Sequence, residues 1–220
     1  MQHILKKDWF PYVFPFVIFL LLTEVGRWVP CKIHILYVTK TIIVGALLWF
    51  FRHRYRGDFS RNISLSELAL SIFVGLLCLA IWIIPESYLP KFGVSDGFDP
   101  FSFGLSAGWT RGLIAMRLIG AVVVVPIMEE LFWRSFLLRY LVNSDFKKVA
   151  LGTFTFFSFS TVALLFGLEH HRFVAGIIVG ILYNILVVRQ KKLVPCIVAH
   201  ATTNLGLGIY VLVTRSWMFW

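Results

Sequence analysis

Charged side chains are scarce in this sequence. Asp, Glu, Lys and Arg make up only 15% of its 220 residues, while 59% of the residues are hydrophobic. A typical soluble domain has about 25% charged residues, so this chain lacks the polar surface needed to enclose a soluble core of its size. The excess apolar surface must face membrane lipid. The expected fold class is therefore all-α: a polytopic transmembrane helix bundle of about seven to eight spans.

Cysteine is also rare, and the three cysteines form no pattern. Cys31, Cys78 and Cys196 are scattered along the chain and include no CxxC pair. They indicate no particular redox compartment, and we expect each of them to be a buried small apolar residue.

Negative charge is scarcer than positive charge, with 11 Asp and Glu against 21 Lys and Arg and a net charge of +10. A surplus of this size can indicate a nucleic-acid partner. Here, however, Lys and Arg occur in short clusters between apolar runs, which is typical of residues that set the topology of a membrane protein. We therefore expect no nucleic-acid partner.

Apolar runs of the length that a membrane span needs, about 20 residues, recur along the chain. The first run resembles a signal peptide, but it lacks a small-residue cleavage site, so we expect a retained first span. Residues 85–110 form the only long polar connection. The expected spans are Trp9–Glu24, His34–Phe51, Leu68–Ile84, Leu113–Tyr140, Val149–Leu168, Phe173–Val188 and Leu193–Val213.

Four basic clusters predict the orientation of these spans. If all seven runs cross the membrane, the clusters fall on one side, which the positive-inside rule assigns to the cytoplasm. We therefore expect a cytoplasmic N-terminus and an external C-terminus. The clusters are Lys6 and Lys7; Arg52, Arg54, Arg56 and Arg61; Arg139, Lys147 and Lys148; and Arg189, Lys191 and Lys192.

The fourth apolar run contains charges that a lipid-facing helix would avoid. Residues 126–139 read PIMEELFWRSFLLR, although an ionisable side chain at the bilayer centre costs about 2.5–3.5 kcal/mol even on the mildest scale. On a helix, Glu130 and Arg134 are four residues apart with the acid first, which is the favourable ion-pair arrangement. Glu129 points about 100° away and is a candidate general base. The alternative is a purely structural ion pair.

Two further runs carry polar residues at the spacing of one helical turn. In FGLEHHRF, Phe166 and His170 share a helix face, and in VPCIVAHATTNLGLGIY, His200 and Asn204 do the same. Taken singly, the first pattern is more typical of a polar turn at the interface. The second is equally typical of a hydrogen-bonded pair between helices.

Taken together, the three motifs indicate catalysis. Polar residues inside membrane proteins face the bundle interior or a wet cavity, and they need one another as partners. A Glu and a His suffice to polarise a water molecule, and a His and an Asn suffice to donate hydrogen bonds to a developing oxyanion. The motifs therefore predict hydrolysis in a membrane-embedded cavity.

The expected spans place two of these residues at different depths. His170 closes the fifth run on the outer side, whereas Glu129 lies nearer the inner end of the fourth. A single site needs both at one depth. Either Pro126 breaks the fourth run, or the fifth helix begins later than Val149, near TFTFFSFSTVALLF.

The ordered triple EExxxR, FxxxH, HxxxN resembles the CPBP family, the CAAX proteases and bacteriocin-processing enzymes, which are glutamic-type intramembrane proteases. The chain is also similar to the CAAX-protease-related branch that is associated with bacterial exosortase and PEP-CTERM sorting. The resemblance implies an integral protein of the bacterial inner membrane. We expect residues 1–110 to hold N-terminal spans and the connecting loop, and residues 111–220 to hold the catalytic core, within one integral domain.

The resemblance implies an endopeptidase whose substrate is a membrane-anchored protein or peptide. The first motif's leading glutamate and the second motif's histidine would activate water, and the third motif would form the oxyanion site. No cofactor is expected. The implied catalytic residues are Glu129, His170, His200 and Asn204, and the implied supporting residues are Glu130, Arg134 and Phe166.

Two other functions remain open from the residues alone. A zinc-dependent membrane hydrolase could use Glu129, His170 and His200 as ligands, since imidazole and carboxylate both suit zinc, but no HExxH motif is present. A non-enzymatic transporter or scaffold could use the buried polar groups as a proton or ion path. No inverted repeat is visible in the sequence, which counts against a transporter.

Overall fold

The computed structural model describes residues 7–28, 33–59, 62–93 and 97–220, and the regular secondary structure of these residues is entirely helical. The expected all-α helix bundle is confirmed. The helices are α2 Phe10–Trp28, α3 Ile33–Phe51, α4 Arg56–Phe59, α5 Leu65–Ile83, α6 Ala107–Ile119, α7 Val125–Glu130, α8 Leu138–Tyr140, α9 Phe156–Leu168, α10 Phe173–Gln190 and α11 Val194–Thr214.

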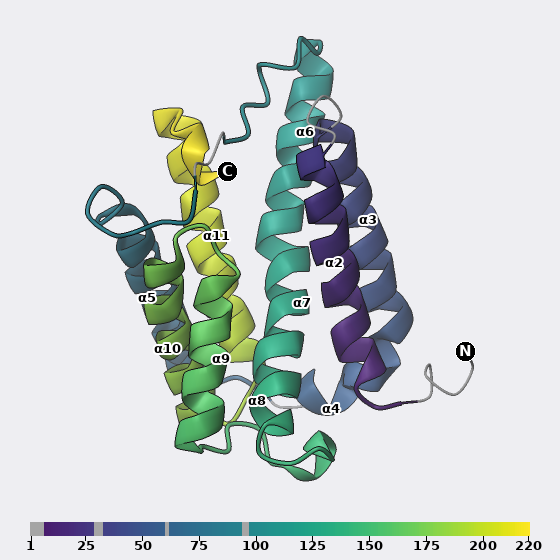
Figure 1. Cartoon of the computed structure of the whole chain (residues 1–220), viewed down its shortest axis with the longest axis vertical. Coiled ribbons are helices and arrows are strands. Elements are labelled where there is room, and N and C mark those ends of the chain that lie inside the picture. The colour runs from purple at the N-terminus through teal and green to yellow at the C-terminus, as the bar shows by residue number, and fades with distance from the viewer. Residues whose placement is uncertain (1–6, 29–32, 60–61, 94–96) are drawn as a thin grey trace.

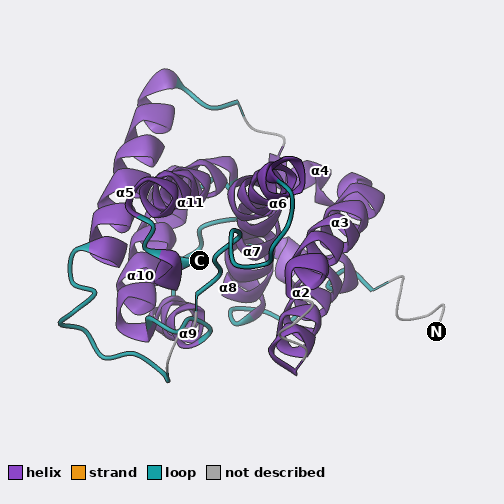
Figure 2. Cartoon of the chain, turned by 90° about the horizontal axis from the view of Figure 1, so that it is seen from above, coloured by secondary structure: helices purple, strands orange, loops and turns teal. Residues whose placement is uncertain are grey.

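The helices form two groups around one long central rod. α6, α7 and α8 continue into one another through the whole molecule, with α2 and α3 on one side and α5, α9, α10 and α11 on the other (Figure 1, Figure 2). Although α5 precedes the polar connection, it packs against α11 and α10. The parts before and after residue 110 therefore share one core, and the division at that residue stays a prediction.

The central rod continues through Pro126. Residues 107–140 form one helical stretch that includes two π-helical segments, Gly120–Val124 and Leu131–Leu137. Proline lacks the N–H that a helix needs, and its ring clashes with the preceding turn. The wider turn of the first π-helical segment lies directly before this ring and accommodates it. A break at Pro126 is therefore not what brings the motifs to one depth.

The fifth helix is shorter than the expected span. α9 covers only 13 residues, Phe156–Leu168, and starts later than Val149. The preceding residues do not continue the helix, because Gly152 has a φ of +73° and Thr155 caps the first turn. Thirteen residues rise about 20 Å, less than the hydrocarbon core of about 30 Å. His170, just beyond α9, therefore lies within the bundle.

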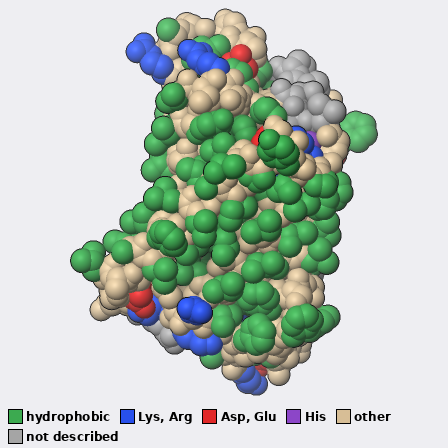
Figure 3. Space-filling model, turned by 90° about the vertical axis from the view of Figure 1, so that its left-hand side faces the viewer, with side chains coloured by type: hydrophobic (Ala, Val, Ile, Leu, Met, Phe, Trp, Pro, Cys, Tyr) green, Lys and Arg blue, Asp and Glu red, His purple; other side chains and the backbone are tan. Residues whose placement is uncertain are grey.

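A broad apolar band covers one face of the bundle. Figure 3 shows a broad band of hydrophobic side chains between two ends that carry Lys and Arg. Five helical stretches are long and apolar enough to cross a membrane, while α2 and α9 are shorter apolar helices. The chain is thus an integral membrane protein. The five stretches are Ile33–Phe59, Leu65–Ile83, Ala107–Tyr140, Phe173–Gln190 and Val194–Thr214.

A glycine permits the close packing of α5 on α11. A Cβ atom at Gly75 would lie 2.5 Å from the carbonyl oxygen of Ala199 and 2.7 Å from Cβ of Thr202. The hydroxyl of Thr203 donates a hydrogen bond to the Gly75 carbonyl at 2.9 Å. Small residues allow such close backbone contact in membrane bundles, and this contact fixes the part of α11 that carries His200.

Two of the three cysteines behave as expected. Cys78 and Cys196 are fully buried and are not in disulfide bonds. Cys31 lies outside the described residues, as do Lys6 and Arg61 of the basic clusters.

The basic clusters lie at one end of the bundle. Asp8, which follows the first cluster, forms ion pairs with Arg54 of the second at 3.0 Å and with Lys147 of the third at 3.3 Å. Lys192 of the fourth cluster contacts Glu67, at the start of α5, at 2.7 Å. This is the lower end of the bundle in Figure 1, and the C-terminus lies toward the other end.

We expect the end with the basic clusters to face the cytoplasm. A reporter that is active only in the cytoplasm should give signal at the N-terminus, and a reporter that is active only outside should give signal at the C-terminus. Reporters that place both termini on one side would contradict this arrangement.

Candidate active site

Two adjacent carboxylates end α7, and both are buried. Glu129 is 4% exposed and Glu130 is 0% exposed. Successive helical residues differ by about 100° in direction, so the two side chains face different neighbours. The Oε2 atom of Glu129 has no hydrogen-bond partner among the described residues. The same is true of Oε2 of Glu130, but its Oε1 is engaged by other side chains. Glu129 is thus the carboxylate at the end of α7 with no side-chain pairing among the described residues, and it is available to hold a water molecule.

Arg134 pairs with Glu130, as their spacing predicts. Its Nη1 donates to Oε1 of Glu130 at 3.1 Å, and both side chains are fully buried. Its Nε donates to Oδ1 of Asn184 on α10 at 3.3 Å, and Nδ2 of Asn184 donates to the carbonyl of Phe159 at 2.9 Å. The guanidinium also lies 4.4 Å from the centroid of the Phe166 ring. Buried charges need such partners, and this network fixes the central rod against α9 and α10.

His200 contacts the same carboxylate from α11. Its Nδ1 lies 2.8 Å from Oε1 of Glu130, and its ring stacks on Tyr183 with 5.4 Å between centroids. An ionised carboxylate only accepts hydrogen bonds, so Nδ1 donates. Nε2 can then donate only when the ring is protonated. The motifs did not predict this contact between His200 and Glu130.

His170 lies in the turn after α9. Its Nδ1 is 2.7 Å from the backbone carbonyl oxygen of Phe166, and because a carbonyl only accepts, Nδ1 carries a proton. In the neutral ring, Nε2 then keeps its lone pair, as a general base requires. The rings of Phe166 and Trp82 pack against the imidazole at 4.9 and 5.3 Å between centroids. Its orientation is therefore fixed.

Asn204 binds the first π-helical segment of the central rod. Its Nδ2 donates to the carbonyl of Ala121 at 2.7 Å. Within this segment the N–H of Val125 pairs with the carbonyl of Gly120. Pro126 has no N–H, so the next carbonyl, that of Ala121, lacks a helical donor, and Asn204 supplies one. A primary amide has two N–H groups, which leaves one for a ligand.

The side chains of the three motifs meet at one cavity of about 230 Å³. We call it the catalytic cavity. Glu130 and Arg134 do not line it, so the structure separates the residues that face the cavity from the ion pair behind them. The motif residues that line it are Glu129, Phe166, His170, His200 and Asn204.

An ion pair fixes the polar connection beside the catalytic cavity. Arg172, which lines the cavity, donates to both carboxylate oxygens of Glu86. Burial opposes the charge on Glu86, but hydrogen bonds from Arg172 and Lys91 outweigh this effect and lower the pKa of Glu86. The segment after α5 is thereby held against the start of α10.

The structure adds residues to the site that the motifs did not indicate. Tyr183 and Thr203 line the catalytic cavity with their hydroxyl oxygens 2.8 Å apart. Glu169, beside His170, is a half-buried carboxylate whose Oε2 atom is buried and has no hydrogen-bond partner among the described residues. Asn184, which binds Arg134, stands inside the apolar run ILYNILVV, a signal of a buried polar role that the sequence does offer. Tyr183 and Thr203 give no comparable signal.

The region that holds the site is similar to a known protein family. Residues 110–206 match the model described as "Type II CAAX prenyl endopeptidase Rce1-like", and all three motifs lie inside this match. Over these residues the chain is similar to the Rce1-like family of CPBP proteins. No curated protein and no solved structure matches the chain.

The Rce1-like region extends from α6 into α11. It therefore includes every predicted catalytic residue, and the similarity is to a family of membrane endopeptidases. The chain before residue 110 also contributes to the site. Trp82 of α5 lies outside the Rce1-like region and lines the catalytic cavity.

Proposed function

We propose that this chain is an intramembrane endopeptidase that hydrolyses a peptide bond in a membrane-anchored protein or peptide. One observation carries the proposal: Glu129, His170, His200 and Asn204 line a single cavity, and all four lie in the Rce1-like region. The proposal includes a location in the bacterial inner membrane. Similarity to the exosortase-associated branch favours a substrate that is cleaved during protein sorting.

Glu129 and His170 would activate the water molecule. The unpartnered Glu129 oxygen or Nε2 of His170 accepts a proton from the water, and the water oxygen attacks the carbonyl carbon of the scissile bond. A tetrahedral intermediate forms with negative charge on the former carbonyl oxygen. When the C–N bond breaks, the departing nitrogen takes up the proton that the base had accepted.

His200 and Asn204 would stabilise the negative charge on that oxygen. The second N–H of the Asn204 amide and the Nε2–H of protonated His200 are the available donors, since their other donors already bind Ala121 and Glu130. Donors held in place before the reaction lose little by reorganising when charge develops. The ion pair of Glu130 with Arg134 thus acts behind the cavity, by positioning His200.

The proposal is tested with purified protein in liposomes that also contain C-terminally anchored candidate substrates. We expect cleavage that EDTA and phenanthroline do not inhibit. No three His, Cys, Asp or Glu side chains of the described residues are grouped so that they could hold a metal ion, although Glu129, His170 and His200 share the catalytic cavity.

Two other outcomes would contradict a metal-independent endopeptidase. Loss of cleavage in chelator, its restoration by zinc, and stoichiometric zinc in the purified protein would support a zinc hydrolase instead. Absence of cleavage for all substrates, together with ion flux that depends on Glu129, would support the transporter alternative.

A further inference from the structure

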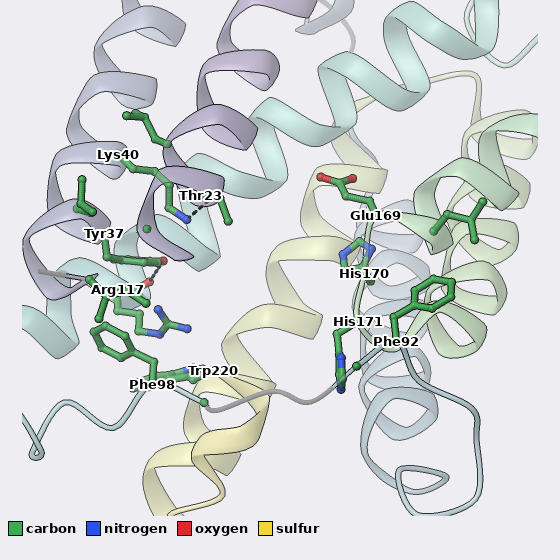
Figure 4. A pocket seen from close by; sticks show the side chains of 17 residues that line it. Thr23, Tyr37, Lys40, Phe92, Phe98, Arg117, Glu169, His170, His171 and Trp220 are labelled. Carbon is green, nitrogen blue, oxygen red and sulfur yellow. Dashed lines mark hydrogen bonds between the residues drawn. The ribbon is translucent and has the colours of Figure 1, made fainter. Parts of the chain in front are cut away.

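A second and larger cavity adjoins the catalytic cavity. It has a volume of about 870 Å³, and it shares His170 and His171 with the catalytic cavity. Its walls come from α2, α3 and α6 on one side and from the segments around residues 93 and 168–171 on the other (Figure 4). We call it the vestibule, and its polar lining includes Thr23, Tyr37, Lys40, Arg117, Glu169 and His170.

Lys40 places a buried cation in the vestibule wall. Its side chain belongs to α3 and is only 9% exposed. The ammonium donates to the hydroxyl of Thr23 at 2.9 Å and lies 4.3 Å and 5.0 Å from the ring centroids of Phe19 and Tyr37. Among the described residues no carboxylate pairs with it. An ammonium has three N–H donors, so donors remain for a ligand.

Arg117 adds a second cation from α6. Its guanidinium carbon lies 4.5 Å from the centroid of the same Tyr37 ring and 4.3 Å from that of Phe98. Its Nε is buried and has no hydrogen-bond partner among the described residues. Aromatic rings therefore hold both cations in place by cation–π contacts, which use no N–H donor. Nε of Arg117 and the donors of Lys40 that do not bind Thr23 stay available for a ligand.

The two cations lack a counter-charge in the described structure. Ionisable groups inside membrane proteins normally pair with one another or mark the path of a ligand. Glu169 is the carboxylate that lines the vestibule, but it lies on the opposite wall beside His170, across the space from Lys40 and Arg117 (Figure 4). An anion from outside the chain would complete this wall.

We propose that Lys40 and Arg117 bind a carboxylate of the peptide substrate, so that the vestibule is a specificity subsite for an acidic group near the scissile bond. This inference rests on the proposed endopeptidase function. The carboxylate could be the C-terminus of the substrate or an Asp or Glu side chain.

The wall that the two cavities share favours a peptide over a lipid headgroup as the source of the anion. A peptide bond held beside Glu129 and His170 leaves one flank of the peptide next to His170 and His171, which also line the vestibule. The vestibule volume lies within the range of ligand pockets, about 300–1,000 Å³, so it can admit an extended segment. A phospholipid phosphate would have no need of a site beside the catalytic residues.

The test compares three forms of one internally quenched candidate substrate peptide: a free C-terminal carboxylate, a C-terminal amide, and the amide with Asp placed at successive positions. Wild-type protein should favour one of the acidic forms over the plain amide by about tenfold or more in kcat/KM, the usual size of a charge-assisted contact. The form that is favoured identifies the source of the carboxylate.

Substitutions of Lys40 and Arg117 test whether these two side chains cause the preference for the acidic substrate. Lys40→Met and Arg117→Gln should each move the ratio of acidic to amide kcat/KM toward one, while Arg117→Lys should retain part of the preference. The matched control is Arg111→Gln, which removes an exposed arginine from the same helix and should leave the ratio as in wild type. A ratio that Lys40→Met and Arg117→Gln do not alter, in folded protein, would overturn the proposal.

Binding measurements separate this inference from the proposed function. Full-length Glu129→Gln protein should bind the acidic peptide about tenfold or more tighter than the amide, whether or not the wild type cleaves it. Tighter binding without any wild-type cleavage would support the carboxylate site and contradict the endopeptidase. Equal binding of both peptides would overturn the carboxylate site, and phosphatidylglycerol binding that depends on Lys40 and Arg117 would show a lipid site instead.

Discussion

Glu129→Gln is expected to reduce peptide-bond hydrolysis by about 10²–10⁴-fold, the usual contribution of a general base. Glutamine has nearly the same shape as glutamate but cannot accept a proton from water. The Oε2 atom of Glu129 makes no hydrogen bond to other described residues, so the substitution breaks no structural contact at that atom. The measurement is the rate of cleavage in liposomes at equal amounts of folded protein.

The matched control for this substitution is Glu67→Gln. Glu67 caps the start of α5, far along the chain from the motifs, and it does not line the catalytic cavity. Glutamine also serves at this position of a capping box, so cleavage should stay near the wild-type rate. Wild-type activity in Glu129→Gln would refute the assignment of the base.

His200 and Asn204 are expected to act in the transition state more than in substrate binding. Both would donate to the same oxyanion, and loss of one such donor typically reduces kcat by about 10²–10³-fold. Asn204→Ala should therefore lower kcat sharply with little change in KM, and His200→Ala should do the same. Steady-state kinetics on each purified variant measures the two constants separately.

The double variant His200→Ala/Asn204→Ala tests directly whether the two side chains donate to the same oxygen. Because the two donors serve one oxygen, its loss of kcat should fall well short of the product of the single losses. Each variant must first be shown to be folded by thermal melting, since Asn204 also binds Ala121 and His200 also binds Glu130. A raised KM at unchanged kcat would instead make these residues substrate-docking groups.

Much of the fold and part of the site follow from local patterns in the sequence. Low charge and repeated apolar runs require a helical membrane bundle, because lipid offers no hydrogen-bond partners to an irregular backbone. The pairing of Glu130 with Arg134 follows from the helical period, which brings residues four apart together. Glu129, His170, His200 and Asn204 were found as polar residues in apolar runs, and they line one cavity.

Hydropathy could not predict that Glu129 and His170 lie at the same depth in the bundle. An apolar stretch from Val149 to Leu168 has the composition of a full span, yet Gly152 and Thr155 postpone the start of α9. Hydropathy records how apolar a segment is and says nothing about where its backbone turns. The short helix then brings His170 to the level of Glu129.

Contacts between distant segments depend on packing that no local pattern specifies. The contact of His200 with Glu130 joins residues 70 positions apart, and that of Asn204 with Ala121 joins residues 83 positions apart. The second contact exists because Pro126 leaves a carbonyl without a donor and α11 packs close enough to supply one. Lys40 and Arg117 also appeared as ordinary charges in the sequence. They share a cavity because α3 packs against α6, and the partners of a charge inside a bundle are set by which helices pack together rather than by its neighbours along the chain.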